Sequence, residues 1–304
     1  MKRFAILLAL SLTLFAEEIE LTAVYSEKEM LIPQGPTMTP PMLKMPYKKP
    51  WLAVGLSSLF PGLGHVYLGD YRTAGELGGI SLGAGFAGIE SQGGMSILQN
   101  TWMYGLFGVY RDARVYNSGS TYRYKMPTDS FADLSLAPFR PRVMKRMEVW
   151  GGILGFLALE SAVVHFAFSQ DTTMETKVSH IHPVFALPVG IGEESLFRGY
   201  LQPALSEIFT PWGGIALSSV AFTAAHISNA TMFEEKDQWR YYAYALPLIA
   251  TFSVYSGWLT YKNNSLQESV AVHAWYDFVL FLGSALAQSS LEEKELRFST
   301  CTSF

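Results

Sequence analysis

The sequence contains little cysteine and little charge. Its one cysteine, Cys301, lies near the C-terminus, which excludes an internal disulfide and a cysteine-rich zinc site. Only 16% of the 304 residues are charged, whereas soluble domains contain roughly 25%. The net charge of −4 provides no basic face and argues against nucleic-acid binding. A disordered chain is excluded as well, because 49% of the residues are hydrophobic and 14% are aromatic.

The N-terminal 50 residues are interpreted as two non-globular segments. Residues 1–16 have two basic residues, an apolar core and a terminal Ala16, which is the pattern of a secretory signal peptide. Leu14 stands where a smaller residue is preferred for cleavage, so an uncleaved anchor is the alternative. Residues 17–50 are polar and then proline-rich, which predicts an extended tether.

From Trp51 onward, long apolar runs alternate with short polar breaks. Each run is near the ~20 residues that a bilayer core requires. We therefore predict an all-α fold, in the form of a polytopic transmembrane helix bundle. The bundle is expected to lie in a bacterial inner membrane, so that the lipid bilayer is one of its partners. The eight predicted membrane segments are 51–69, 74–92, 97–113, 147–169, 181–208, 211–227, 241–260 and 265–287. Trp51, Trp150, Trp212 and Trp258 fall near their ends, where amphipathic rings favour the membrane interface.

The polar breaks divide the rest of the chain into four regions. Residues 51–116 are predicted to form a transmembrane hairpin region of unknown role, with a helix break at Pro61-Gly62. The basic stretch 117–146 is assigned to the cytoplasm by the positive-inside tendency. Residues 147–287 form the main membrane domain, and 288–304 form a polar tail.

The first charged motif lies inside the main membrane domain. The stretch GIGEESLFRGYLQPAL places Glu193, Glu194 and Arg198 where ionised groups cost several kcal/mol unless they are paired. Glu194 and Arg198 are four residues apart and meet on one helical face, which predicts a structural ion pair. Glu193 is turned by about 100° around the axis. It is either a spare carboxylate beside that pair or a residue of an active site, and we favour the active site.

Two further motifs each place a histidine one turn from a partner. SSVAFTAAHIS puts Phe222 and His226 on one helical face, and ESVAVHAWYDFVLF does the same for His273 and Asp277. Taken alone, His226 is interpreted as an interhelical hydrogen-bonding residue, and His273–Asp277 as a pair that holds two helices together. Asp277 lies where a charge is expensive, so it needs a partner, a proton or a metal.

The three motifs together provide two histidines and several carboxylates on three separate helices, a set that can form a catalytic site. It can hold Zn²⁺ or another divalent metal, with Glu193, His226, His273 and Asp277 as candidate ligands. It can equally work without a metal, with a glutamate that activates water and histidines that stabilise an oxyanion. The sequence contains no H-E-x-x-H, no G-x-S-x-G, no strand-linked G-x-G-x-x-G and no P-loop, which excludes the common enzymes built on those motifs.

The order and spacing of the motifs are similar to those of a known family. E-E-x-x-x-R, F-x-x-x-H and H-x-x-x-N/D resemble the signatures of the CPBP family of intramembrane proteases, which includes CAAX proteases, bacteriocin-processing enzymes and the Abi proteins. The resemblance covers about 180–285. It implies that 147–287 is a CPBP-like protease domain that cleaves a membrane-associated or transmembrane peptide. The reaction would be that of a metalloprotease or would need no metal.

The resemblance also implies a role for each motif residue. Glu193 would be the general base, assisted by His226, and Glu194, Arg198 and Phe222 would give structural support. His273 and Asp277 would bind the oxyanion or a metal. Many members have Asn at the last position; an Asp side chain donates a hydrogen bond to an oxyanion only when it is protonated.

Two other functions stay open at this stage, and so does one geometric problem. The chain could be a non-catalytic membrane scaffold or immunity protein that retains the protease fold, or a proton-coupled transporter.

His226 lies late in its predicted span, whereas His273 lies partway into a span that begins on the same side of the membrane. They can meet only if one helix begins late, tilts strongly or re-enters.

Overall fold

The structure is a computed structural model that describes residues 46–89, 91–117, 122–168 and 182–301. The predicted signal peptide (1–16) and residues 17–45 of the predicted tether lie outside the described residues. Within the described ranges every regular element is helical and no strand occurs. The predicted all-α fold class is therefore confirmed.

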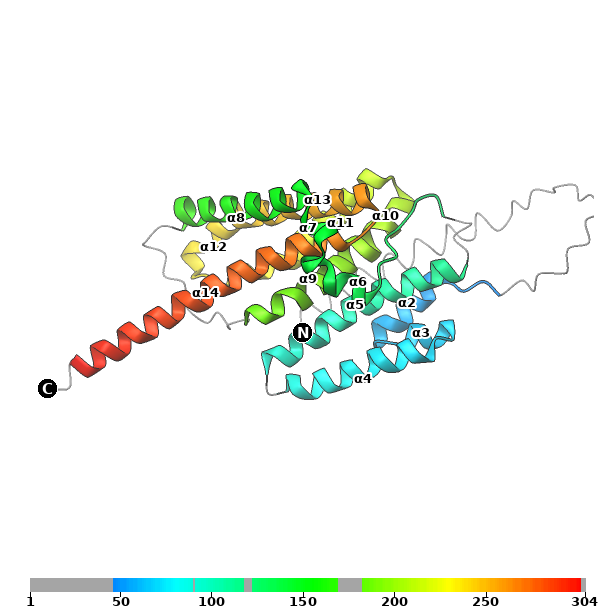
Figure 1. The fold of residues 1–304 in the computed structure, drawn as a ribbon, viewed down its shortest axis with the longest axis horizontal. Coiled ribbons are helices and arrows are strands. Elements are labelled where there is room, and N and C mark those ends of the chain that lie inside the picture. Colours follow the sequence, from blue (N-terminus) through cyan, green and yellow to red (C-terminus); the bar gives the residue numbers. More distant parts are fainter. Residues whose placement is uncertain (1–45, 90, 118–121, 169–181, 302–304) are drawn as a thin grey trace, which may run out of the picture.

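The predicted N-terminal hairpin region folds as a group of helices around its last member. They are α2 (Pro50–Leu59), α3 (Leu63–Leu68), α4 (Tyr71–Gly88) and α5 (Gln92–Tyr116), and the first three pack against α5 (Figure 1). The expected break at Pro61-Gly62 is present. Gly62 has a φ of 96° before α3, a left-handed conformation that glycine adopts without strain. A Cβ there would also collide with the carbonyl oxygen of Ala74 in α4.

The C-terminal part is a bundle that combines long helices with short helical turns. In chain order its elements are α8 (Met147–Ala167), η2 (Pro183–Phe185), α9 (Ala186–Glu194), the π-helix η3 (Ser195–Leu201), α10 (Gln202–Ile208), α11 (Pro211–His226), η4 (Ile227–Met232), η5 (Glu235–Asp237), α12 (Gln238–Arg240), the π-helix η6 (Tyr241–Ala245), α13 (Leu246–Asn263) and α14 (Gln267–Cys301). α14 continues past the predicted end at 287, so residues 288–301 of the predicted tail are helical.

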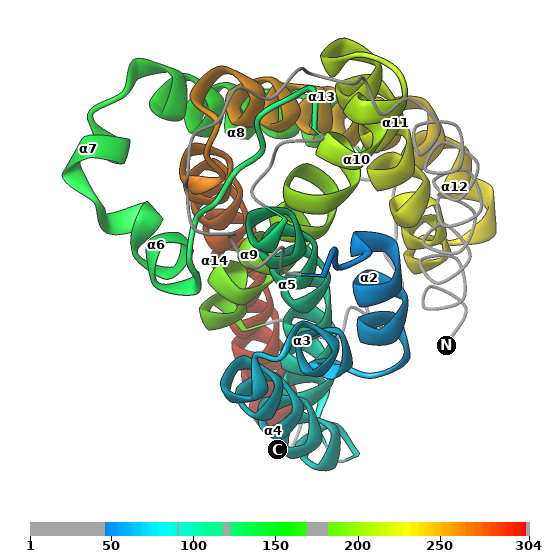
Figure 2. The same cartoon turned by 90° about the vertical axis from the view of Figure 1, so that its right-hand side faces the viewer.

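One continuous helical path runs through the centre of the molecule. α9, η3 and α10 follow one another between α5 on one side and α11, α13 and α14 on the others (Figure 2). This central path carries the E-E-x-x-x-R motif. The motif residues are therefore surrounded by the helices that carry the two histidines.

The segment between α5 and α8 fastens the start of α14. It contains the short helices α6 (Phe131–Leu136), η1 (Ala137–Phe139) and α7 (Pro141–Met144). Hydrogen bonds from Ser130 lower the pKa of Asp133 to about 2, so its carboxylate stays ionised and pairs with Arg140 at 2.8 Å. Arg140 also donates to the side-chain oxygen of Gln267, the first residue of α14.

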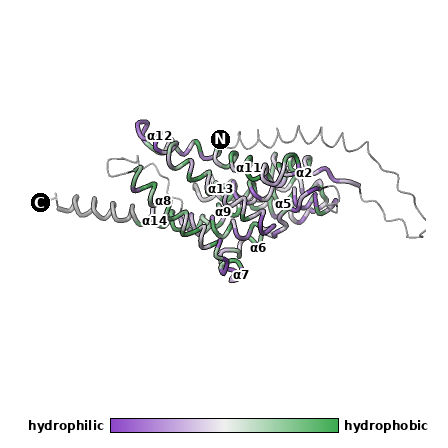
Figure 3. The backbone as a smooth tube through the Cα atoms, turned by 90° about the horizontal axis from the view of Figure 1, so that it is seen from above, coloured by the Kyte–Doolittle hydropathy of each residue, from purple (hydrophilic) through white to green (hydrophobic). Residues whose placement is uncertain are grey.

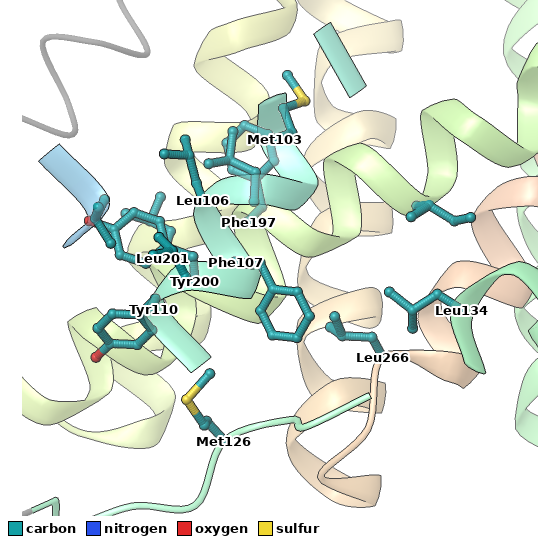
Figure 4. Packing of buried hydrophobic residues seen from close by; sticks show 14 of the residues in the cluster. Met103, Leu106, Phe107, Tyr110, Met126, Leu134, Phe197, Tyr200, Leu201 and Leu266 are labelled. Carbon is teal, nitrogen blue, oxygen red and sulfur yellow. The ribbon is translucent and has the colours of Figure 1, made fainter. Parts of the chain in front are cut away.

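The largest apolar cluster lies where α5 meets the central path. Phe107 of α5 is fully buried, and the rings of Tyr110 and Tyr200 meet edge to face at 5.1 Å (Figure 4). Leu266, just before α14, belongs to the same cluster and is also fully buried. Buried aromatic rings supply much of the packing energy of a core. This cluster therefore packs the central path against α5 and against the residue that precedes α14.

Two described helical stretches are long and apolar enough to cross a membrane, Met147–Ala167 and Gln267–Leu286. Only 22% of the most apolar window of the first is buried by protein, and its Leu154 and Phe166 are exposed. α8 is apolar along most of its length in Figure 3, whereas hydrophilic residues gather at α12 and near α7. The other predicted spans coincide with shorter, interrupted or less apolar helices, so the arrangement of about eight membrane segments stays a prediction.

Gly192, directly before Glu193, is a point of close contact between α9 and α5. An added Cβ would lie 2.8 Å from both Cα and Cβ of Asn100. We expect Gly192→Ala to push the two helices apart and lower stability by about 1–3 kcal/mol, measured as a lower thermal-unfolding midpoint in detergent. Gly151→Ala in α8 is the control, because nothing lies within 4 Å of its added Cβ. Equal losses at the two positions would contradict the packing explanation.

Candidate active site

Glu193 lies at the point where three helices meet. It is the penultimate residue of α9, and its Oε2 atom is 3.9 Å from Nε2 of His226 and 3.8 Å from Nε2 of His273. The two histidines belong to α11 and α14. The side chain of Glu193 is 17% exposed and that of His226 is 22% exposed, so both are partly accessible from outside the protein.

Glu194 points in another direction and is fully buried. Its Oε1 atom is 3.2 Å from Nη1 of Arg198, in the ion pair that the spacing predicted. The same oxygen accepts a hydrogen bond of 2.7 Å from Nδ1 of His273. Glu194 therefore connects the central path to α14 and fixes the orientation of the His273 ring. The sequence interpretation had given it only the ion pair.

Arg198 lies in the π-helix η3 and braces the central path against two other helices. Its Nη2 atom donates to the side chain and the backbone carbonyl of Ser253 in α13. Its guanidinium group lies 4.3 Å from the ring centre of Phe222 in α11, a cation–π contact. Single π-helical turns are frequent at functional sites, and this one places Arg198 between its carboxylate partner and α13.

His226 ends α11 with its ring held by that helix. Its Nδ1 atom is 2.8 Å from the carbonyl oxygen of Phe222, and since a carbonyl only accepts, Nδ1 is the donor. Nε2 of the neutral ring is therefore the acceptor that faces Glu193. The rings of Phe222 and His226 lie 4.5 Å apart, and the hydroxyl of Tyr241 donates to the backbone carbonyl of His226.

His273 and Asp277 lie one turn apart on α14. Nε2 of His273 is 3.5 Å from Oδ2 of Asp277. The aromatic ring of Phe252 meets the His273 ring edge to face at 5.1 Å. Together with the Nδ1 bond to Glu194, these contacts hold the imidazole so that its Nε2 faces both Glu193 and Asp277.

A buried start of α14 allows the two histidines to meet. Ser269, in the first turn, is fully buried, and Asp129 accepts hydrogen bonds from the backbone of Leu266 and the side chain of Gln267. α14 therefore begins inside the protein, beneath the segment 122–146, instead of at its surface. α14 begins at Gln267, close to the predicted start at 265, so the choice among a late start, a strong tilt and re-entry stays open.

The four candidate metal ligands come from three helices, α9, α11 and α14. In the part of the chain that the structure describes, no group of three or more His, Cys, Asp or Glu side chains is placed so that it could hold a metal ion. Glu193 lies 3.9 Å from His226 and 3.8 Å from His273, and His273 lies 3.5 Å from Asp277. The donor types suit a divalent metal, and metal binding at these four residues stays a prediction.

One further carboxylate near the site was missed in the sequence. Glu160, in the apolar helix α8, accepts a hydrogen bond of 3.1 Å from the hydroxyl of Tyr276. The ring of Tyr276 stacks on Phe252, which in turn contacts His273. A carboxylate in the middle of an apolar run was the available signal, yet only the tertiary structure shows that α8 lies beside this part of α14.

Comparison with known proteins places these residues in a family. Residues 178–279, about a third of the 304-residue chain, match the model of the Rce1-like family, described as type II CAAX prenyl endopeptidase Rce1-like. No curated protein and no solved structure matches the chain. The matched region contains all three motifs, from Glu193 to Asp277.

The match concerns the region that contains the candidate active site. The matched family is one of membrane-embedded CAAX-type proteases, which act on peptides or proteins. Residues 178–279 match the Rce1-like model of the CPBP family, which confirms the resemblance seen in the motifs. The roles of the individual site residues stay predictions.

Proposed function

We propose that the chain is an intramembrane endopeptidase in which Glu193 activates water to hydrolyse a peptide bond. The observation that supports this most directly is that Nε2 of His226 and Nε2 of His273 both face Oε2 of Glu193, at 3.9 and 3.8 Å. These distances exceed a hydrogen bond. They suit a water molecule that contacts the carboxylate and one imidazole together.

The two imidazoles are proposed to act differently because their partners differ. Nδ1 of His226 donates to a carbonyl, so Nε2 is free to accept a hydrogen bond from the attacking water. Glu193 takes the water proton while the water oxygen attacks the carbonyl carbon. As the C–N bond breaks, that proton passes from Glu193 to the leaving amine, so that the carboxylate is regenerated.

His273 is proposed to stabilise the oxyanion. Its Nδ1 donates to the carboxylate of Glu194, so Nε2 donates to a substrate oxygen when the ring is an imidazolium. Glu193, Glu194 and Asp277 surround the ring and would balance its positive charge. Asp277 would donate to the same oxygen only in its protonated form.

A metal-free reaction is expected from the positions of the donor atoms. We expect peptide cleavage by the purified protein to survive treatment with EDTA, and elemental analysis to find Zn²⁺ and other divalent metals well below one per chain. Loss of cleavage on chelation, with recovery on adding Zn²⁺, would contradict this mechanism. Such a result would instead make Glu193, His226, His273 and Asp277 a metal site that forms after a rearrangement.

The protein reconstituted in liposomes with membrane-anchored reporter peptides tests the proposed activity. Cleavage is expected within or next to the anchored segment, detected as new peptide termini by mass spectrometry. A non-catalytic scaffold or immunity protein would leave every reporter intact, and a proton-coupled transporter would move protons across the membrane without cutting them. Localisation of the tagged chain to a bacterial inner membrane would test the predicted membrane placement.

A further inference from the structure

A cavity of about 370 Å³ lies next to the central helical path, away from Glu193 and the two histidines. Its lining includes Arg198, Gln202 and Ser206, which follow one another at four-residue intervals along η3 and α10. The end of α13 and the segment before α6 complete the lining, with Thr260, Tyr261 and Lys262 from the former and Tyr124, Lys125 and Pro127 from the latter. Figure 2 shows the segment before α6 passing beside α10 and α13. Cavities of this size are typical of small-ligand sites.

The described lining of this cavity contains three cationic side chains and no carboxylate. Arg198 pairs with Glu194, and Lys262 pairs with Glu148 at 3.0 Å. Lys125 is exposed and forms no ion pair with a described residue. Among the lining side chains, Lys125 is therefore the one cation that no described carboxylate pairs with.

The mouth of the cavity has the side chains expected at a membrane surface. Tyr261 lines the cavity and is 50% exposed, and its ring lies 6.0 Å from that of Trp212, which is 61% exposed. Exposed tyrosine and tryptophan favour the level of the lipid headgroups. The neighbouring segment 117–146 is the basic region predicted to face the cytoplasm, and cytoplasmic leaflets contain anionic lipids.

We propose that this cavity binds a phosphate anion, carried by the headgroup of an anionic phospholipid. Lys125 would contact the phosphate at the rim, and Arg198 would face it from the floor. Nη1 of Arg198 lies 3.2 Å from Oε1 of Glu194 but makes no aligned hydrogen bond with a described group. Free inorganic phosphate is the other source of the same chemistry. The proposal concerns binding and does not depend on proteolysis.

Occupation of the cavity would act on a side chain that also supports the active site. Arg198 pairs with Glu194, and Glu194 orients His273. An anion beside Arg198 would compete with Glu194 for its guanidinium. Lipid binding is thereby linked to the orientation of His273 through one shared residue.

The test is a binding titration of the full-length protein in a nonionic detergent. Short-chain phosphatidylglycerol, phosphatidylcholine of the same chain length and inorganic phosphate are added separately, and the thermal-unfolding midpoint is followed. We expect phosphatidylglycerol to raise the midpoint saturably and phosphatidylcholine to leave it unchanged. Lys125→Ala should weaken the apparent affinity for phosphatidylglycerol about fivefold, as expected for one surface cation.

Two matched variants separate this site from a general effect of charge. Lys125→Arg keeps the cation and should bind as the wild type does. Lys145→Ala removes another exposed lysine from the same basic segment, outside the cavity lining, and should also behave as the wild type. A Lys125-dependent shift with inorganic phosphate alone would support the phosphate site with the free anion as its ligand. The proposal is overturned if Lys125→Ala responds as the wild type does, or if Lys145→Ala loses as much affinity.

Discussion

Glu193→Gln is expected to lower the rate of peptide cleavage by about 10²–10⁴-fold, the contribution typical of a general base. The amide has nearly the same shape as the carboxylate but cannot take a proton from water. Its neighbours, Nε2 of His226 and Nε2 of His273, stay in place because each ring is held through Nδ1. The loss should therefore appear in kcat, measured with a membrane-anchored reporter peptide, with little change in KM.

A matched control shows whether the loss is specific to this carboxylate. Glu76 of α4 pairs with Arg72 on the exposed surface, and Glu76→Gln should retain wild-type cleavage. Circular dichroism and the thermal-unfolding midpoint should be unchanged in both variants. Undiminished cleavage by Glu193→Gln would contradict its assignment as the base, and a general loss of fold in that variant would assign Glu193 to structural support.

Arg198→Leu is expected to destabilise the protein by about 3–5 kcal/mol, the cost of leaving one partner of a buried ion pair without the other. Glu194 is fully buried beside Arg198, so its charge would lose the compensating guanidinium. The contacts of Arg198 with Ser253 and with the ring of Phe222 would be lost as well. Thermal unfolding in detergent measures the effect.

The double variant Glu194→Leu/Arg198→Leu separates stability from catalysis. Replacing both members of a buried pair by apolar residues is often neutral for stability, so the unfolding midpoint should recover most of the loss. Cleavage should not recover, because His273 loses the carboxylate that its Nδ1 contacts. Recovery of both properties would show that Glu194 does not orient His273 for the reaction.

Short-range spacing made much of the site predictable from the sequence. The pairs Glu194–Arg198, Phe222–His226 and His273–Asp277 are each four residues apart and lie in contact in the structure. Helical geometry alone brings such residues together. The all-helical fold class was predictable for a similar reason, because apolar runs of helical length alternate with short breaks.

Contacts between helices were not predictable in this way. The common approach of His226 and His273 to Glu193 depends on the buried start of α14, which Asp129 holds from a segment more than a hundred residues earlier in the chain. The position of Glu160 beside Tyr276 depends on the packing of α8 against α14. No local pattern encodes either arrangement.

The sequence by itself determined the helical class, the charged residues inside apolar runs and the resemblance of their motifs to the CPBP family. Those properties follow from composition and from residues a few positions apart. Only the tertiary structure decided that Glu194 serves both Arg198 and His273, and that the other nitrogen of each histidine faces Glu193. It also decided that three cations from separate segments line one cavity. The direction of a side chain toward another helix is decided by how whole helices pack, and packing energy is shared among many residues that are distant in the chain.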